Sequence, residues 1–89
     1  MDDTLGLLEE AVQLARDVGY EVREEPLGEL PGGPCAVGGR RIILINLEQS
    51  AAERLAVLVG CLARDPGIEA RPLSRLLAAR LRASRPDAT

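Results

Sequence analysis

The fold is decided by the stretch Arg40-Arg41-Ile42-Ile43-Leu44-Ile45-Asn46-Leu47, whose centre holds four consecutive aliphatic residues. A strand with one face in water alternates apolar and polar residues, whereas a strand covered on both faces reads as a continuous apolar run. We therefore expect residues 42–45 to form the central strand of a small sheet and to be buried on both faces. The simplest additional cover for so small a sheet is a second copy of the chain.

Two further strands are predicted around this one. Residues 20–24 alternate apolar and charged side chains, which is typical of a half-exposed edge strand. Residues 35–37 form a short strand, and Gly38-Gly39 supplies the two-residue turn that leads antiparallel into the central strand. The loop between them, residues 26–34, is rich in proline and glycine. We expect a three-stranded antiparallel sheet.

Three helices complete the predicted fold. Residues 4–18 are amphipathic, and a third helix runs from Pro72 to about Ser84. The middle helix, which extends to about Arg64, has the clearest start, because Ser50 and Glu53 have the spacing of a capping box. The order is α-β-β-β-α-α in a single α+β domain over residues 1–89, with residues 84–89 as a frayed tail.

Composition excludes several partners. The chain of 89 residues carries a net charge of −3, and Tyr20 is its single aromatic residue, so the basic patch and stacking surface of a nucleic-acid binder are both missing. We expect no nucleic-acid partner. No apolar run approaches the roughly 20 residues that cross a bilayer, and no secretory signal pattern is present. The sequence predicts a cytoplasmic protein without a membrane partner.

Enzymatic chemistry has few candidates. The absence of histidine excludes Ser-His-Asp and Cys-His catalysis and the common imidazole metal sites, and the absence of lysine excludes Schiff bases and a P-loop lysine. We expect no catalytic residue, metal or cofactor. Cys35 and Cys61 have neither metal-ligand nor disulfide-framework spacing, so we expect free thiols. A redox role for Cys35, close in sequence to Arg40 and Arg41, stays open.

Two binding surfaces are predicted. An anion could bind the backbone amides of Gly32 and Gly33 together with the side chains of Arg40 and Arg41. A protein interface could use a second apolar strip on the middle helix or the charged ends of the chain, since residues 1–29 are strongly acidic and residues 71–89 basic. The candidate interface residues are Val57, Gly60, Cys61, Arg75 and Arg82.

Two resemblances carry further expectations. The aliphatic strand and the helix after it, within residues 35–64, resemble the strand-to-helix core of the ImmA/IrrE zinc peptidases. The positions that match are Asn46, Ser50 and Arg54, while the family's two ligand histidines and catalytic glutamate fall at Val59, Ala63 and Gly60. This resemblance implies a degenerate core without metal or catalysis.

The chain also resembles short uncharacterised bacterial proteins with a G-G-x-C segment, a hairpin and a Ser-capped helix. The residues that carry this likeness are Gly32, Gly33, Cys35, Gly39, Arg40, Arg41, Ile45, Asn46 and Ser50. No activity follows from it. We expect a non-enzymatic, homodimeric protein-interaction module, with an unidentified second protein as a further partner. The alternatives are a small-anion binding module and a degenerate peptidase-like protein.

Overall fold

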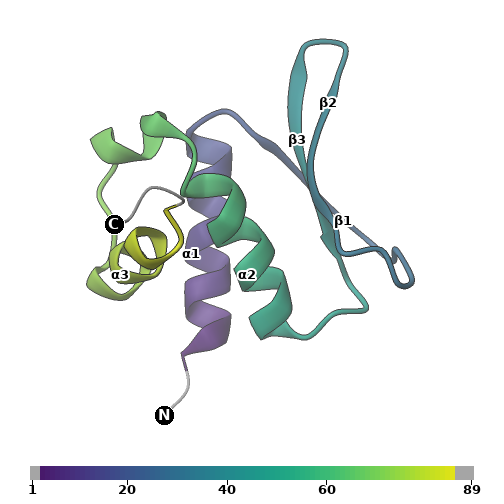
Figure 1. The fold of residues 1–89 in the computed structure, drawn as a ribbon, viewed down its shortest axis with the longest axis horizontal. Helices are drawn as coiled ribbons and strands as arrows, with labels where there is room; N and C mark the ends of the chain where they lie inside the picture. The colour runs from purple at the N-terminus through teal and green to yellow at the C-terminus, as the bar shows by residue number, and fades with distance from the viewer. Residues whose placement is uncertain (1–2, 86–89) are drawn as a thin grey trace.

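A three-stranded sheet and a layer of helices make up residues 3–85, the part of the chain that this computed structural model describes (Figure 1). The elements in chain order are α1 (Thr4–Asp17), β1 (Glu21–Glu25), β2 (Gly33–Val37), β3 (Arg40–Asn46), α2 (Ala51–Leu62), the 3-10 helix η1 (Pro66–Ala70) and α3 (Arg75–Ala83). The predicted order of helices and strands is confirmed. A frayed tail was predicted for residues 84–89, of which residues 86–89 lie outside the described part of the chain.

The predicted all-antiparallel sheet is wrong. The strand order is β1-β3-β2, so β3 is central as expected, but β1 runs parallel to β3 while β2 runs antiparallel to it. The prediction assumed that consecutive strands turn back on each other. Instead, the loop after β1 crosses the end of β3 and starts β2 on its other side, which leaves β1 and β3 pointing the same way.

Asn46, the last residue of β3, holds that crossing loop. Its side-chain oxygen accepts from the backbone amides of Leu27 at 3.0 Å and Glu48 at 2.9 Å. Its side-chain nitrogen donates to the carbonyl oxygens of Gly28 at 2.9 Å and Leu30 at 2.8 Å. Because Asn46 is only 1% exposed, these four bonds satisfy a polar group that would otherwise be costly to bury.

The helices cover one face of the sheet. Helix α1 packs against α2 and β1, α2 packs against β3 and β2, and α3 packs against α1 and α2. Alternation along β3 sends Ile43 and Ile45 into this helical layer, where both join the main apolar cluster. Ile42 and Leu44 point to the opposite face, where Ile42 is 3% exposed and Leu44 is half-buried. A second copy is therefore not needed to bury Ile42.

The predicted turn at Gly38-Gly39 is confirmed. Both residues have positive φ, 56° and 79°, as a type I′ hairpin turn requires. The turn joins Val37 to Arg40 and extends beyond the helical layer (Figure 1). The hairpin therefore reaches outward, and its base at β2 lies next to α2.

Helix α2 begins at the predicted capping box. The Ser50 hydroxyl accepts from the Glu53 amide at 3.1 Å, and the Glu53 carboxylate accepts from the Ser50 amide at 2.9 Å. The side of this helix that enters the core consists of Leu55, Leu58, Val59 and Leu62, while Ala52, which has the same spacing, is exposed. The opposite side of α2 is left for other contacts.

Helix α3 starts later than predicted, at Arg75 rather than near Pro72. Ser74 caps it by accepting from the Leu77 amide, and Glu10 of α1 accepts from both the amide and the hydroxyl of Ser74, at 2.8 and 2.6 Å. A contact from a distant helix thus sets this boundary. The segment between α2 and α3 forms η1 and buries Ile68.

Candidate functional site

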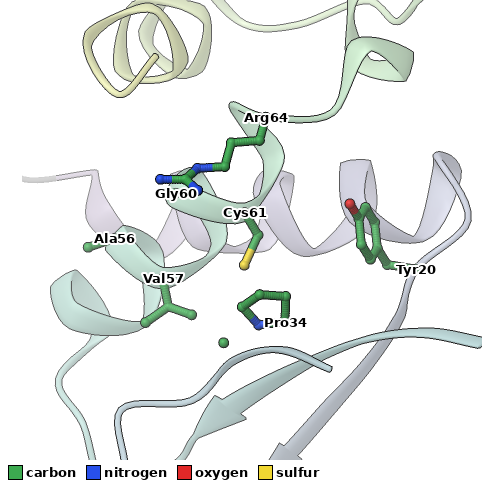
Figure 2. A pocket seen from close by; sticks show the side chains of 8 residues that line it. Tyr20, Pro34, Ala56, Val57, Gly60, Cys61 and Arg64 are labelled. Atoms are coloured by element: carbon green, nitrogen blue, oxygen red, sulfur yellow. The ribbon is translucent and has the colours of Figure 1, made fainter. Parts of the chain in front are cut away.

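A largely apolar cleft lies between α2 and β2, with a volume of about 450 Å³ (Figure 2). We call it the α2–β2 cleft. Its lining consists of Tyr20, Gly33, Pro34, Ala56, Val57, Gly60, Cys61 and Arg64. A concave apolar surface with a few polar groups is the usual character of a binding site.

Small residues keep the α2–β2 cleft open. Figure 2 shows the side chains of Val57 and Cys61 pointing from α2 toward the ring of Pro34 on β2. Gly60 adds no side chain, and a Cβ placed there would meet no atom within 4 Å. A glycine inside a helix costs roughly 0.5–1 kcal/mol relative to alanine, so an alanine would fit this position and stabilise the helix. The open space at Gly60 is thus not required by the packing of the single chain.

The two cysteines lie in different surroundings. Burial raises the pKa of the Cys61 thiol, and the nearby charge of Arg64 offsets this only in part, which keeps the group protonated at neutral pH. Cys35 is half-buried on β2, where alternation sends its side chain to the sheet face opposite to that of Pro34. Both thiols are free, and they lie on different faces of the sheet.

Arg41 joins three elements at one end of the α2–β2 cleft. Its guanidinium donates to the Asp65 carboxylate at 2.9 Å and to the carbonyl of Val18, and lies 4.3 Å from the centroid of the Tyr20 ring. Burial and the Asp65 carboxylate raise the pKa of Tyr20. Burial acts to raise the pKa of Asp65 as well, but hydrogen bonds from the Gly67 amide, Tyr20 and Arg41 outweigh it and lower that pKa. This cluster braces the fold.

The predicted anion site is not brought together. The register of the hairpin puts Gly33 opposite Leu44, whereas Arg40 lies opposite Val37 at the far end of the same strand pair. Gly32 lies against the backbone of Leu44, beside Gly33. The two glycines therefore lie at one end of the β2–β3 pair, and the two arginines lie at the other end.

Arg40 and Arg41 instead border a hollow together with Arg16. This polar hollow has a volume of about 470 Å³ and lies near the end of α1. Arg40 pairs with Glu21 and Arg41 with Asp65. Within residues 3–85, Arg16 has no hydrogen bond or ion pair of its side chain, so it is the free cation of this hollow.

The five candidate interface residues divide into two groups. Val57, Gly60 and Cys61 lie together along the α2–β2 cleft. Arg75 and Arg82 lie on α3, where Arg75 is exposed and Arg82 borders a separate small hollow with Arg85. The sequence strip on α2 was therefore a useful signal, while the residues that complete the cleft from elsewhere, Tyr20, Pro34 and Arg64, had no local signal.

Residues 3–85 hold no group of three or more Cys, Asp or Glu side chains placed to bind a metal ion. Over the same range, no helix has the length and apolar character needed to cross a bilayer.

Comparisons with known proteins add no assignment. No family model, curated protein or solved structure matches the chain. The resemblances to zinc-peptidase cores and to short bacterial proteins therefore stay predictions.

Proposed function

We propose that this protein is a non-enzymatic interaction module that self-associates as a homodimer through α2. The observation that carries the proposal is the α2–β2 cleft, whose lining is apolar, concave and unfilled among the described residues. Exposed apolar surfaces of this kind mark sites where a partner binds. The chain lacks histidine and lysine, which supports contact rather than catalysis.

The helix face is a better contact surface than the open face of the sheet. On that face Ile42 is already buried within one chain and Leu44 is half-buried, while the exposed Val37 lies at its far end beside the hairpin turn. A partner there would therefore cover mainly one exposed apolar side chain. In the α2–β2 cleft, by contrast, Ala56 and Gly60 are exposed and Val57 is half-buried. A partner in the cleft would therefore bury more exposed apolar surface than one on the open face of the sheet.

Sedimentation equilibrium tests the proposal. The surface is small, so we expect a weak dimer with a dissociation constant of about 10–100 μM. The average mass should rise from that of the 9.5 kDa monomer toward twice that value between about 1 μM and about 500 μM. A constant monomer mass over this range would refute the proposal.

A second candidate function is small-anion binding in the hollow of Arg16, Arg40 and Arg41. The free guanidinium of Arg16 supports it. The pairing of the other two arginines with carboxylates counts against it, because their charge is already compensated. Inorganic phosphate should raise the melting temperature of the wild type and not that of an Arg16→Ala variant; equal shifts in both would remove this candidate.

A further inference from the structure

We infer that α2 of one chain packs antiparallel against α2 of a second copy, with a two-fold axis between Val57 and Gly60. This inference rests on the proposed self-association and specifies its geometry. It follows from the position of α2 in the helical layer and from the order of charges on its free face.

Helix α2 has one free side. Its core residues Leu55, Leu58, Val59 and Leu62 face α1, α3 and the sheet. At about 100° per residue, Glu53, Val57 and Gly60 lie within roughly 60° of one another on the opposite side, and Arg64 follows directly after the last turn. Val57 on this side borders the α2–β2 cleft and is half-buried, whereas Glu53 and Gly60 are exposed.

The charges on this side are self-complementary. Glu53 lies four residues before Val57, and Arg64 lies four residues after Gly60. A two-fold axis between Val57 and Gly60 therefore sets Val57 against Gly60 of the partner subunit. The same register sets Glu53 against Arg64 of the partner subunit, twice by symmetry. Within residues 3–85, Arg64 makes no ion pair that would compete.

The middle of this face suits close contact between helices. Gly60 has no side chain, and Ala56 is small and exposed, so two helix backbones can approach to the short end of the usual 8–10 Å separation. Figure 2 shows the Arg64 side chain extending beside Gly60, at the edge of the α2–β2 cleft. A second α2 placed there would cover the cleft and bring an acidic group toward this guanidinium.

The free edge of β2 is a weaker surface for the same partner. The hairpin turn makes Val37 and Arg40 a hydrogen-bonded pair. Alternation along β2 therefore leaves the backbone groups of Pro34 and Ala36 pointing to the free edge of the sheet. Pro34 has no N–H to donate, which limits the bonds that an added strand could form. We therefore assign the contact to the helices, with the β2 edges lying alongside.

Two variants test the register by sedimentation equilibrium. Gly60→Leu places a bulky side chain on the axis, yet it should keep or raise the stability of the single chain, because the Cβ meets open space and leucine favours helix. Arg64→Glu turns both intersubunit pairs into like-charge contacts. Each variant should weaken dimerisation by about tenfold or more. The matched controls, Ala79→Leu and Arg80→Glu on the exposed side of α3, should leave it unchanged.

Charge reversal on both sides completes the test. The double variant Glu53→Arg with Arg64→Glu restores opposite charges across the axis, so its dissociation constant should return to within about threefold of the wild type. It loses the capping box, and circular dichroism should confirm that it is folded at the temperature used. A dimer unaffected by Gly60→Leu and Arg64→Glu would overturn this geometry and leave self-association standing, whereas a wild-type monomer at every concentration would overturn both.

Discussion

The side-chain amide of Asn46 donates a hydrogen bond to the backbone carbonyl of Leu30 at 2.8 Å, which joins the end of the central strand to the loop that crosses it. The loop connects β1 and β2 on opposite sides of β3. Without this bond and those that Asn46 makes with Leu27 and Gly28, the crossing segment would need water as the partner of its polar backbone groups. Asn46 therefore supports the mixed pairing of the sheet.

Replacing Asn46 should show how much this support is worth. Asn46→Ala leaves the amide of Leu27 and the carbonyls of Gly28 and Leu30 without their partner, and we expect a loss of about 3 kcal/mol in the free energy of unfolding by urea. The control Gln13→Ala removes an exposed amide that bonds Asp17 and should cost less than about 0.5 kcal/mol. Equal effects would show that Asn46 does not hold the loop.

The charge of Asp65 should make stability depend on pH in the acid range. Its folded-state pKa is lowered below 3.8, so its contribution is present above that pH and is lost as the pH falls through the folded-state pKa. Asp65→Asn can still accept from the Gly67 amide, which isolates the charge. At neutral pH it should cost about 1 kcal/mol, a modest value because Arg41 is half-exposed.

Urea unfolding of wild type and Asp65→Asn at a series of pH values measures this effect. The difference between the two proteins should shrink as the pH falls below about 4. Glu69→Gln serves as the control, since the Glu69–Arg85 pair is exposed and should change stability by less than about 0.5 kcal/mol. A difference that stayed constant with pH would argue against the ion pair of Asp65 with Arg41.

The capping box should stabilise α2 measurably. Ser50→Ala removes the hydroxyl that accepts from the Glu53 amide, and we expect a loss of about 1 kcal/mol in thermal or urea unfolding. Ser50→Asp keeps an acceptor oxygen at the helix start and should recover most of this loss. A Ser50→Ala variant as stable as the wild type would show that water can replace the hydroxyl of Ser50 and that the cap does not stabilise α2.

Two glycines should respond to alanine in opposite directions. Gly60→Ala should raise the free energy of unfolding by about 0.5–1 kcal/mol, because its Cβ enters open space in a helix. Gly39→Ala should lower it by about 1 kcal/mol, because φ is 79° in the hairpin turn. Both are measured at low micromolar concentration, where the single chain dominates. A destabilised Gly60→Ala would place an unrecognised contact at this position.

Much of the local structure could be predicted because local chemistry specifies it. Ser50 and Glu53 cap a helix through bonds three residues apart, and the glycine pair at residues 38–39 makes its turn by φ alone. The start of α3 could not be predicted in this way. Pro72 suggested an earlier start, but Ser74 is held by Glu10, a contact between residues far apart in the chain.

The candidate site divides along the same line. The strip of Val57, Gly60 and Cys61 can be found on a helical wheel, because a period of 3.6 residues places them on one side. Their placement beside Pro34, Tyr20 and Arg64 depends on how α2 packs over the sheet. The residues of the predicted anion site are separated by the hairpin register, which the two-residue turn at Gly38-Gly39 sets locally by pairing Val37 with Arg40 and Gly33 with Leu44.

By itself the sequence determined the class of the fold, the order of its elements, the central position of residues 40–46 and the absence of histidine and lysine chemistry. The direction of β1 was decided only by the tertiary structure. Its alternating pattern suits either edge of β3 and either direction, because strand pairing uses backbone groups that every residue carries. The loop that Asn46 binds sets the parallel direction of β1. The same loop places β2 beside α2, and the α2–β2 cleft lies between them.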